Sequence, residues 1–464
     1  MGFRRQTDAN GLQSVGSERD GNASQITSEL GHRPPRGKVA TTFGKFQASN
    51  HVATLQPDVR QNQRVRCKLR QAVHGLAMVA LAVGAGNAVA EESTAEQRQQ
   101  VRLPETPYDY TQASLPKYVR KHAAMYDNTP ADNPITNHGA TLGRVLFYDR
   151  QLSRNGTTSC ASCHQQKLAF TDGKKVSVGF DRKAVTRNSM SLLNLRYYRR
   201  GKMFWDERAA SLEAQVLMPI ENKVEMGHRL PELTRQLQAD PLYPPLFAAA
   251  FGSPQVTSER MARSLAQFIR ALVAFRSKYD VGRDQVATVH DAFPNFSKQE
   301  NYGKELFLGR ARCAECHLEP QPGVPLDSAA RQSAFFFIAK PTVNGVDSDV
   351  PKVDLGVGAA TQRREDQGRF KVSSLRNILL TGPYMHDGRF ITIEQVVEHY
   401  NWSVRPHPNL DPRLADFAAN GLALPETEKV ALIEFLGTLT DRQILSDPRF
   451  SDPFVRRPSP VESE

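Results

Sequence analysis

The chain has 464 residues, of which 39% are hydrophobic and 23% charged, so it can bury a substantial core and is not disordered throughout. Its formal net charge is +11, but residues 1–90 hold 12 basic and 5 acidic residues, which leaves residues 91–464 at only +4. A balance this mild gives no indication of a nucleic-acid partner. Five cysteines are too few for a disulfide scaffold, and no uncharged apolar run reaches the ~18–20 residues of a membrane span.

The first ninety residues have the composition of a targeting segment and not of a folded domain. Residues 1–63 lack apolar periodicity, which predicts a disordered extension or a start codon assigned too early. Residues 64–90 have the three parts of a secretory signal: a basic stretch, a short apolar stretch and small residues ending at Ala90. A buried helix is the alternative for this stretch. We expect cleavage after Ala90 and a periplasmic protein, from which Cys67 has been removed.

The four remaining cysteines belong to two copies of a Cys-x-x-Cys-His motif. The first copy is Cys160, Cys163 and His164, and the second is Cys313, Cys316 and His317. This spacing is typical of covalent c-type haem, in which both thiols add to the porphyrin vinyl groups and the His ligates iron. A zinc site or two disulfides would also use these cysteines, but neither needs a His directly after each second Cys. The sequence therefore predicts two covalently bound haem c groups.

The remaining elements, taken in chain order, are predominantly helical. A Gly-x-x-Leu-Phe pattern occurs at 143–147 and again at 303–307, shortly before each haem motif. Residues 207–218 and 257–276 have the apolar spacing of amphipathic helices, and Pro425 opens a final helix. Strand signals are confined to short runs.

The fold class that we predict is mostly α, with two cytochrome c-like helical domains, each around one covalent haem. We expect five segments along the chain: the N-terminal extension 1–63, the signal peptide 64–90, a first haem domain 91–293, a second haem domain 294–447 and a flexible tail 448–464.

The order of motifs resembles the bacterial di-haem cytochrome c peroxidase superfamily over roughly residues 105–445. The matching stretches are 152–164, 204–210, Pro219 with 224–226, 370–377 and 381–388. The resemblance implies that the first haem is the site of reaction with hydrogen peroxide and that the second transfers electrons.

The resemblance also implies roles for three residues near the first haem. Trp205 matches the tryptophan between the haems, and Gln215 and Glu225 match residues of the distal pocket. A carboxylate in a haem pocket can move a proton from the near to the far oxygen of a peroxide. From the residues alone, Glu225 is equally an ordinary surface residue and Trp205 a core aromatic.

Two further sets of residues concern bound groups. By the resemblance, Asn188, Thr381 and Pro383 match positions that hold a calcium ion between the haems, the last two through backbone carbonyls. Arg208 and Arg376 can pair with haem propionates, because arginine suits bidentate recognition of carboxylates. An ordinary salt bridge is the alternative for both arginines.

The sequence departs from the peroxidase members of the superfamily at two positions. Those members carry a His between the first haem motif and the tryptophan, but no His lies between His164 and Trp205. We therefore expect the first iron to be open to peroxide. They also place a Met fourteen residues after the His that corresponds to His386, where this chain has Tyr400. Tyrosinate ligates ferric haem in catalase, so Tyr400 is the predicted second ligand of the second haem.

Other residues near Tyr400 keep alternatives open. Met385 and His399 are competing ligands, and a second haem without a side-chain ligand is a further alternative. Trp402 either packs against the fold or forms an exit for oxidising equivalents.

These two departures resemble the MauG and MbnH-type branch. In that branch peroxide oxidises both haems, and the oxidising equivalents modify tryptophan in a separate protein. The resemblance implies hydrogen peroxide as a substrate and a small exported, copper-associated partner. The alternatives are a peroxidase that takes electrons from a small cytochrome or cupredoxin, and a non-catalytic di-haem electron carrier.

Overall fold

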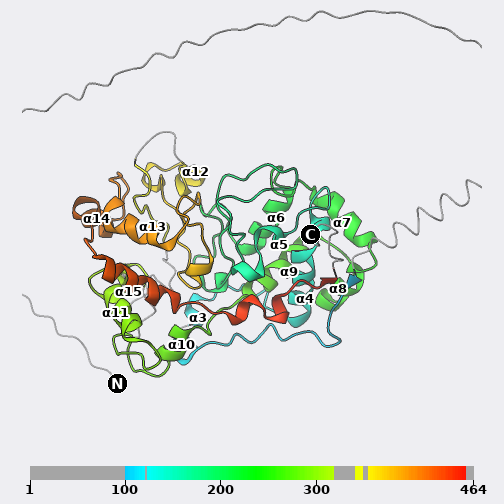
Figure 1. Cartoon of the computed structure of the whole chain (residues 1–464). Coiled ribbons are helices and arrows are strands. Elements are labelled where there is room, and N and C mark those ends of the chain that lie inside the picture. The colour runs from blue at the N-terminus through cyan, green and yellow to red at the C-terminus, as the bar shows by residue number, and fades with distance from the viewer. Residues whose placement is uncertain (1–99, 121–122, 318–339, 349–353, 456–464) are drawn as a thin grey trace, which may run out of the picture. The chain divides into compact units, whose positions relative to one another are not determined.

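The structure is a computed structural model that describes residues 100–120, 123–317, 340–348 and 354–455. Helices dominate these residues (Figure 1). The mostly helical fold class is therefore confirmed. The expected extension and signal peptide lie outside these residues. Within the described ranges, every helix is too short or too polar to span a bilayer.

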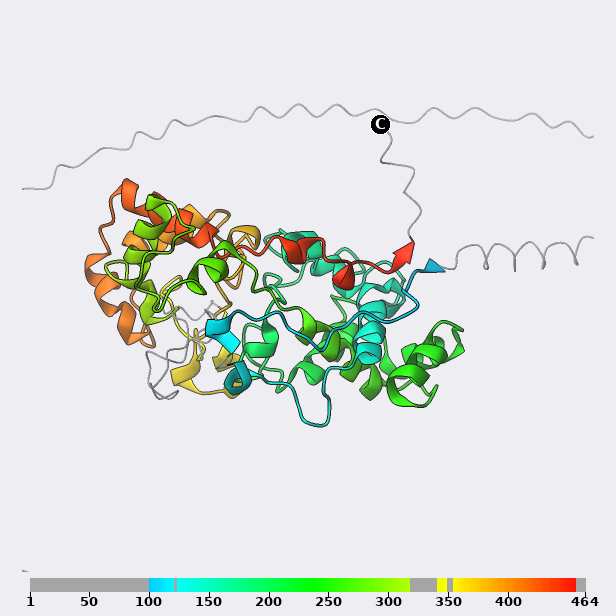
Figure 2. The ribbon, with the colours of Figure 1, turned by 90° about the horizontal axis from the view of Figure 1, so that it is seen from below.

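The α-helices around the first haem motif are α2 (Lys117–Arg120), α3 (Ala123–Tyr126), α4 (Asn137–Tyr148), α5 (Cys160–Cys163), α6 (Leu212–Glu221), α7 (Leu230–Ala239), α8 (Tyr243–Phe251) and α9 (Ser258–Ala271). Those that follow are α10 (Lys278–Arg283), α11 (Lys298–Leu308), α12 (Val357–Thr361), α13 (Ile393–Glu398), α14 (Ala415–Asn420) and α15 (Glu426–Gly437). A π-helical turn continues α13 over His399–Ser403. Strands β1 (Gln100–Val101) and β2 (Phe454–Val455) pair antiparallel, and Figure 2 shows the two arrows side by side.

Short 3-10 turns connect these helices. They span Arg150–Leu152, Gln166–Leu168, Leu195–Tyr197, Cys313–Glu315, Arg364–Asp366, Ile378–Leu380, Pro412–Leu414, Gln443–Leu445 and Pro448–Phe450.

Two glycines explain the repeated Gly-x-x-Leu-Phe pattern. Gly143 of α4 lies against α9, where an added Cβ would be 2.0 Å from the carbonyl oxygen of Ser264. Gly303 of α11 lies against α15, where an added Cβ would be 1.9 Å from the carbonyl oxygen of Ala431. Each glycine therefore lets two helices cross with their backbones in contact, and the Phe of each pattern is buried beside that crossing.

The two hydrophobic cores divide the chain differently from the expected domains. Apart from three residues near the C-terminus, the first core holds buried residues from Tyr110 to Ala274, and the second holds residues from Tyr279 to Leu439. Residues 279–293, which we assigned to the first domain, therefore pack with the second core. The reason is local: Tyr279 packs against Phe293, with ring centroids 5.3 Å apart.

The end of the chain also differs from expectation. The segment 441–455, here called the C-terminal strap, leaves the second core and packs on the first. Its residues Ile444, Phe450 and Phe454 are buried in the first core, so residues 448–455 are not a flexible tail. The Pro- and Ser-rich composition of the terminus concealed these apolar anchors.

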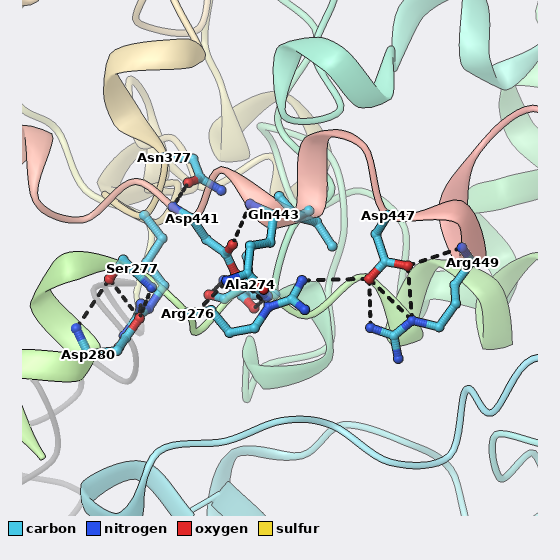
Figure 3. Close-up of polar contacts among 12 residues, drawn as sticks. Ala274, Arg276, Ser277, Asp280, Asn377, Asp441, Gln443, Asp447 and Arg449 are labelled. Atoms are coloured by element: carbon cyan, nitrogen blue, oxygen red, sulfur yellow. Dashed lines mark hydrogen bonds and ion pairs between the residues drawn. The ribbon is translucent and has the colours of Figure 1, made fainter.

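Polar contacts fix the beginning of the strap to both halves of the chain (Figure 3). Asp441 accepts a hydrogen bond from the backbone N–H of Arg276 at 3.0 Å and donates its own N–H to Asn377 Oδ1 at 2.6 Å. Further along, Asp447 pairs with Arg276 at 3.6 Å. The strap is thus anchored both to the segment after α9 and to the loop around Asn377.

Candidate haem sites

The first haem motif is a single helical turn. In α5, Cys160 and Cys163 are three positions apart and so lie on one side of the turn. The His164 N–H donates to the Cys160 carbonyl at 3.0 Å, and His164 Nδ1 lies 2.9 Å from the Phe170 carbonyl oxygen. Because a carbonyl only accepts, Nδ1 carries the proton, and Nε2 keeps the lone pair that a metal ligand requires.

The second motif repeats this geometry. The His317 N–H donates to the Cys313 carbonyl at 2.8 Å, which closes the 3-10 turn Cys313–Glu315. None of the four described cysteines forms a disulfide. Both motifs therefore present two free thiols and a following His in the arrangement that covalent haem attachment needs.

A cavity of about 370 Å³ opens beside the first motif, and we call it the first cavity. Its lining includes Cys163, His164, Gln215 and Glu225. Among the described lining residues, His164 is the single histidine. The fit to a haem with one protein ligand is therefore good, and the two expected distal residues share this cavity.

Glu225 owes its chemistry to its position after α6. It is half-buried, and Asn222 donates a hydrogen bond to its Oε1 at 3.0 Å. Burial raises the pKa of the Glu225 carboxyl, and the nearby Arg208 guanidinium opposes this shift. A carboxyl group with a raised pKa is better suited to accept a proton and to return it.

A second cavity of about 220 Å³ lies beside the second motif. Cys313, Cys316, His317 and Tyr400 all line it. Tyr400 lies in the π-helical turn after α13, and burial raises its pKa to about 12. The expected ligand set of the second haem is thus gathered around one space.

Of the two competing ligands, one shares the second cavity. Met385 lines it, and Asn344 Nδ2 donates to Met385 Sδ at 3.4 Å. His399 is buried with its Nε2 3.0 Å from the Asn344 carbonyl oxygen, and it is not among the lining residues. Of the second-ligand candidates that the sequence raised, Tyr400 and Met385 therefore line this cavity, and His399 does not.

A histidine of the same loop, His386, also lines the second cavity, a role that its position in the sequence did not reveal. His386 is buried, lines the second cavity and stacks on Phe370 with ring centroids 3.8 Å apart. We used it only as the position from which to count to Tyr400. Its place in the stretch 381–388, which matches the family, was the available signal.

The two cavities share part of their walls. Residues on both linings are Asn188, Ser189, Met190, Ser191, Trp205 and Lys371. Trp205 Nε1 donates to the Asn188 carbonyl at 2.8 Å, and the Asn188 N–H donates to the His386 carbonyl at 2.8 Å. The tryptophan therefore stands in the wall between the two cavities, fixed to a loop of each half.

The three expected calcium positions meet at the second cavity. Asn188, Thr381 and Pro383 all line it. Asn188 Nδ2 donates to the Lys174 carbonyl at 2.9 Å, which orients the side-chain amide. Over the described residues, no group of three or more His, Cys, Asp or Glu side chains is placed to hold a metal ion. A cation here would depend on amide and backbone oxygens, the ligands calcium accepts.

The two arginines considered for haem propionates behave differently. Arg376 is almost fully buried and donates to both oxygens of Asp280 at 2.9 Å and to Tyr118 Oη at 2.8 Å, away from either cavity lining. Arg376 therefore forms an ordinary salt bridge with Asp280, the alternative to a haem propionate. Arg208 lines the first cavity but pairs with Asp206 at 3.0 Å.

Comparison with known proteins places these features in a family. A family described as "Di-haem cytochrome c peroxidase" matches residues 137–285. The methylamine utilization protein MauG of Methylorubrum extorquens is 35% identical, covering 67% of this chain and 80% of its own. The cytochrome c551 peroxidase of Nitrosomonas europaea is 34% identical, over 56% of this chain and 71% of its own.

A solved structure agrees with these matches. The crystal structure of a MauG-like protein associated with microbial copper homeostasis superposes with a TM-score of 0.59 and 32% identity, covering 74% of this chain and 99% of that one. Such matches imply an enzyme with two haem cofactors. The chain belongs to the di-haem cytochrome c peroxidase family of oxidoreductases, in its MauG-like branch.

Proposed function

We propose that this protein is a periplasmic enzyme that reduces hydrogen peroxide at the first cavity and withdraws the electrons from a partner protein through the second. The observation that carries the proposal is the pairing of a first cavity whose described lining holds one histidine with a second cavity lined by Tyr400. A non-catalytic carrier normally keeps both irons closed by two protein ligands, so the first cavity argues against that alternative.

The chain's own residues account for the proton movements. Glu225 accepts the proton of the near peroxide oxygen and returns it to the far oxygen, which leaves as water. Gln215, on the same lining, orients the peroxide by hydrogen bonding. Bound haem supplies the redox chemistry, because its iron takes up the two oxidising equivalents that peroxide reduction releases.

The electron balance indicates the kind of partner reaction. Reduction of hydrogen peroxide to two waters consumes two electrons and two protons. A two-electron oxidation of a tryptophan side chain in the partner releases the same number of each. Trp205 connects the two cavities along this route, and Trp402, 59% exposed two residues after Tyr400, is the exit to the partner.

Three finer features complete the proposal. The signal sequence ending at Ala90 exports the chain to the periplasm, where covalent haem attachment takes place. A calcium ion binds at Asn188, Thr381 and Pro383 and fixes the wall between the cavities. The likeness to the copper-associated structure supports a small exported, copper-associated partner.

One observation favours a second candidate function. Met385 lines the second cavity beside Tyr400, and a methionine ligand raises the potential of a haem and suits electron entry from a small cytochrome or cupredoxin. The resulting enzyme would be a peroxidase like the relative from Nitrosomonas europaea.

The first experiment mixes the fully ferric protein with one equivalent of hydrogen peroxide in a stopped-flow spectrometer. We expect rapid spectral changes at both haems without any prior reduction. A mixture that stays silent until one electron has been added would contradict the proposal and support the peroxidase that draws on a small redox protein.

A further inference from the structure

Lys371 is a buried cation in the wall between the two cavities. Its side chain is 2% exposed, and the residue lines both cavities. Its backbone N–H donates to the Trp205 carbonyl at 2.7 Å, so it is tied directly to the tryptophan of that wall. Lys371 belongs to the stretch 370–377 that matches the family, but the sequence alone gave it no role.

The surroundings of the Lys371 ammonium group contain no carboxylate bonded to it among the described residues. Nζ lies 3.8 Å from Met203 Sδ and 4.0 Å from the centre of the Tyr198 ring. The nearest acid, Glu207, is already held by Arg200 through both oxygens and accepts the Tyr198 hydroxyl. A lysine buried in this way either loses its proton or is paired with an anion, because an unpaired buried charge is costly.

The arginines that line the cavities are already neutralised. Arg187 pairs with Asp206 and Asp354, each at 2.6 Å, and Arg208 pairs with Asp206 at 3.0 Å. In the second cavity, Arg312 pairs with Glu315 at 2.7 Å. Of the Lys and Arg side chains on the two described linings, Lys371 is thus the one without a carboxylate ion pair.

A haem brings its own anions, because each porphyrin carries two propionate carboxylates. We propose that Lys371 binds a haem propionate in the wall between the cavities and serves there as its counter-ion. The inference depends on the family's two haems and not on the identity of the electron donor. Burial lowers the pKa of Lys371 to about 7, and an adjacent carboxylate keeps the ammonium form.

The consequence is electrostatic. A fixed positive charge stabilises reduced haem relative to oxidised haem, because the reduced iron carries one positive charge fewer. Lys371 therefore raises the reduction potential of the haem whose propionate it binds.

The test compares Lys371→Met with the control Lys202→Met, which removes an exposed charge from the neighbouring segment. Midpoint potentials of both haems are measured by spectroelectrochemistry, and the carboxylate bands by redox-difference infrared spectroscopy. We expect Lys371→Met to retain two covalent haems, lower the potential of at least one and shift a propionate band. Lys202→Met should match the wild type, since solvent screens its charge.

Unchanged potentials and bands in Lys371→Met would overturn the proposal. If that variant does not assemble, Lys371→Arg and Lys371→Gln are compared. The arginine variant should stay near the wild-type potentials and the glutamine variant should not. An equal fall in both would assign Lys371 a packing role against Tyr198 and Met203 instead.

Discussion

At the scale of single residues, Glu225 shows how position changes the chemistry of a common side chain. In the sequence it resembles any surface glutamate, but the structure places it on the lining of the first cavity. Its half-burial raises the pKa of the carboxyl group, which suits a group that must both take up and release a proton.

Replacing this carboxyl by an amide removes the proton acceptor while leaving the shape. We expect Glu225→Gln to slow the reaction with hydrogen peroxide by roughly 10²–10⁴-fold in stopped-flow measurements. Because the carboxylate form accepts the proton and its pKa is raised, the wild-type rate should fall as the pH drops through that raised pKa. The variant should lose this acid limb. Glu221→Gln, an exposed position at the end of α6, is the control, and a wild-type rate in Glu225→Gln would exclude the proposed role.

A pair of substitutions would identify which side chain, Tyr400 or Met385, ligates the iron of the second haem. Tyr400→Phe removes the phenolate oxygen, so we expect the ferric absorption spectrum of the second haem to change, while Met385→Leu leaves it as in the wild type. The opposite pattern would show that the sulfur is the ligand and would favour the peroxidase alternative. Electronic absorption with electron paramagnetic resonance separates the two haems in this comparison.

Sequence reasoning worked for some of these residues and not for others. The haem cysteines and His164 lie in a short fixed motif, whereas Glu225 and Tyr400 were predicted through the family resemblance, and all of them lie near a cavity or its motif. Lys371 was missed because its proposed role depends on its having no carboxylate partner among the described residues. No local pattern shows that every neighbouring arginine already has a carboxylate partner.

At the scale of elements, the fold is built on two helix crossings of the same design. In each, a glycine in the helix that precedes the haem motif permits backbone contact with a later helix. The repeated pattern was visible in the sequence, whereas its partners, α9 and α15, lie far along the chain and were identified by the structure.

A methyl group at either crossing would have no space. Since overpacking a close contact costs about 1–3 kcal/mol, we expect Gly303→Ala to lower the free energy of unfolding by that amount. Denaturant titration of the holoprotein measures the loss. Gly156→Ala is the control for a glycine with no atom within 4 Å of the added Cβ, although its positive φ adds some backbone strain. A Gly303→Ala protein as stable as the wild type would disprove the close crossing.

At the scale of the whole molecule, the C-terminal strap ties the two cores, because it leaves the second core and packs on the first. The buried pair of Arg376 and Asp280 acts within the second half, where it joins the loop before the turn Ile378–Leu380 to α10. The sequence predicted two helical units but placed their limits by motif spacing, which carries no information on where a terminal segment packs.

The strap should therefore contribute to the stability of the first core. Phe450 is 2% exposed and packs with Phe268 and Tyr110. We expect Phe450→Ala to cost about 3–5 kcal/mol in the free energy of unfolding, the usual cost of removing a buried phenylalanine. Calorimetry of the holoprotein gives the measurement, with Tyr302→Ala on an exposed ring as the control. Equal stability of the two variants would contradict a strap that completes the core.

The position of the strap also bears on the order of synthesis, folding and haem attachment. Because Ile444, Phe450 and Phe454 belong to the core beside the first haem motif, that core is incomplete until residues 441–455 have been synthesised. We therefore expect the chain around Cys160 and Cys163 to be more open to haem attachment before this segment is made.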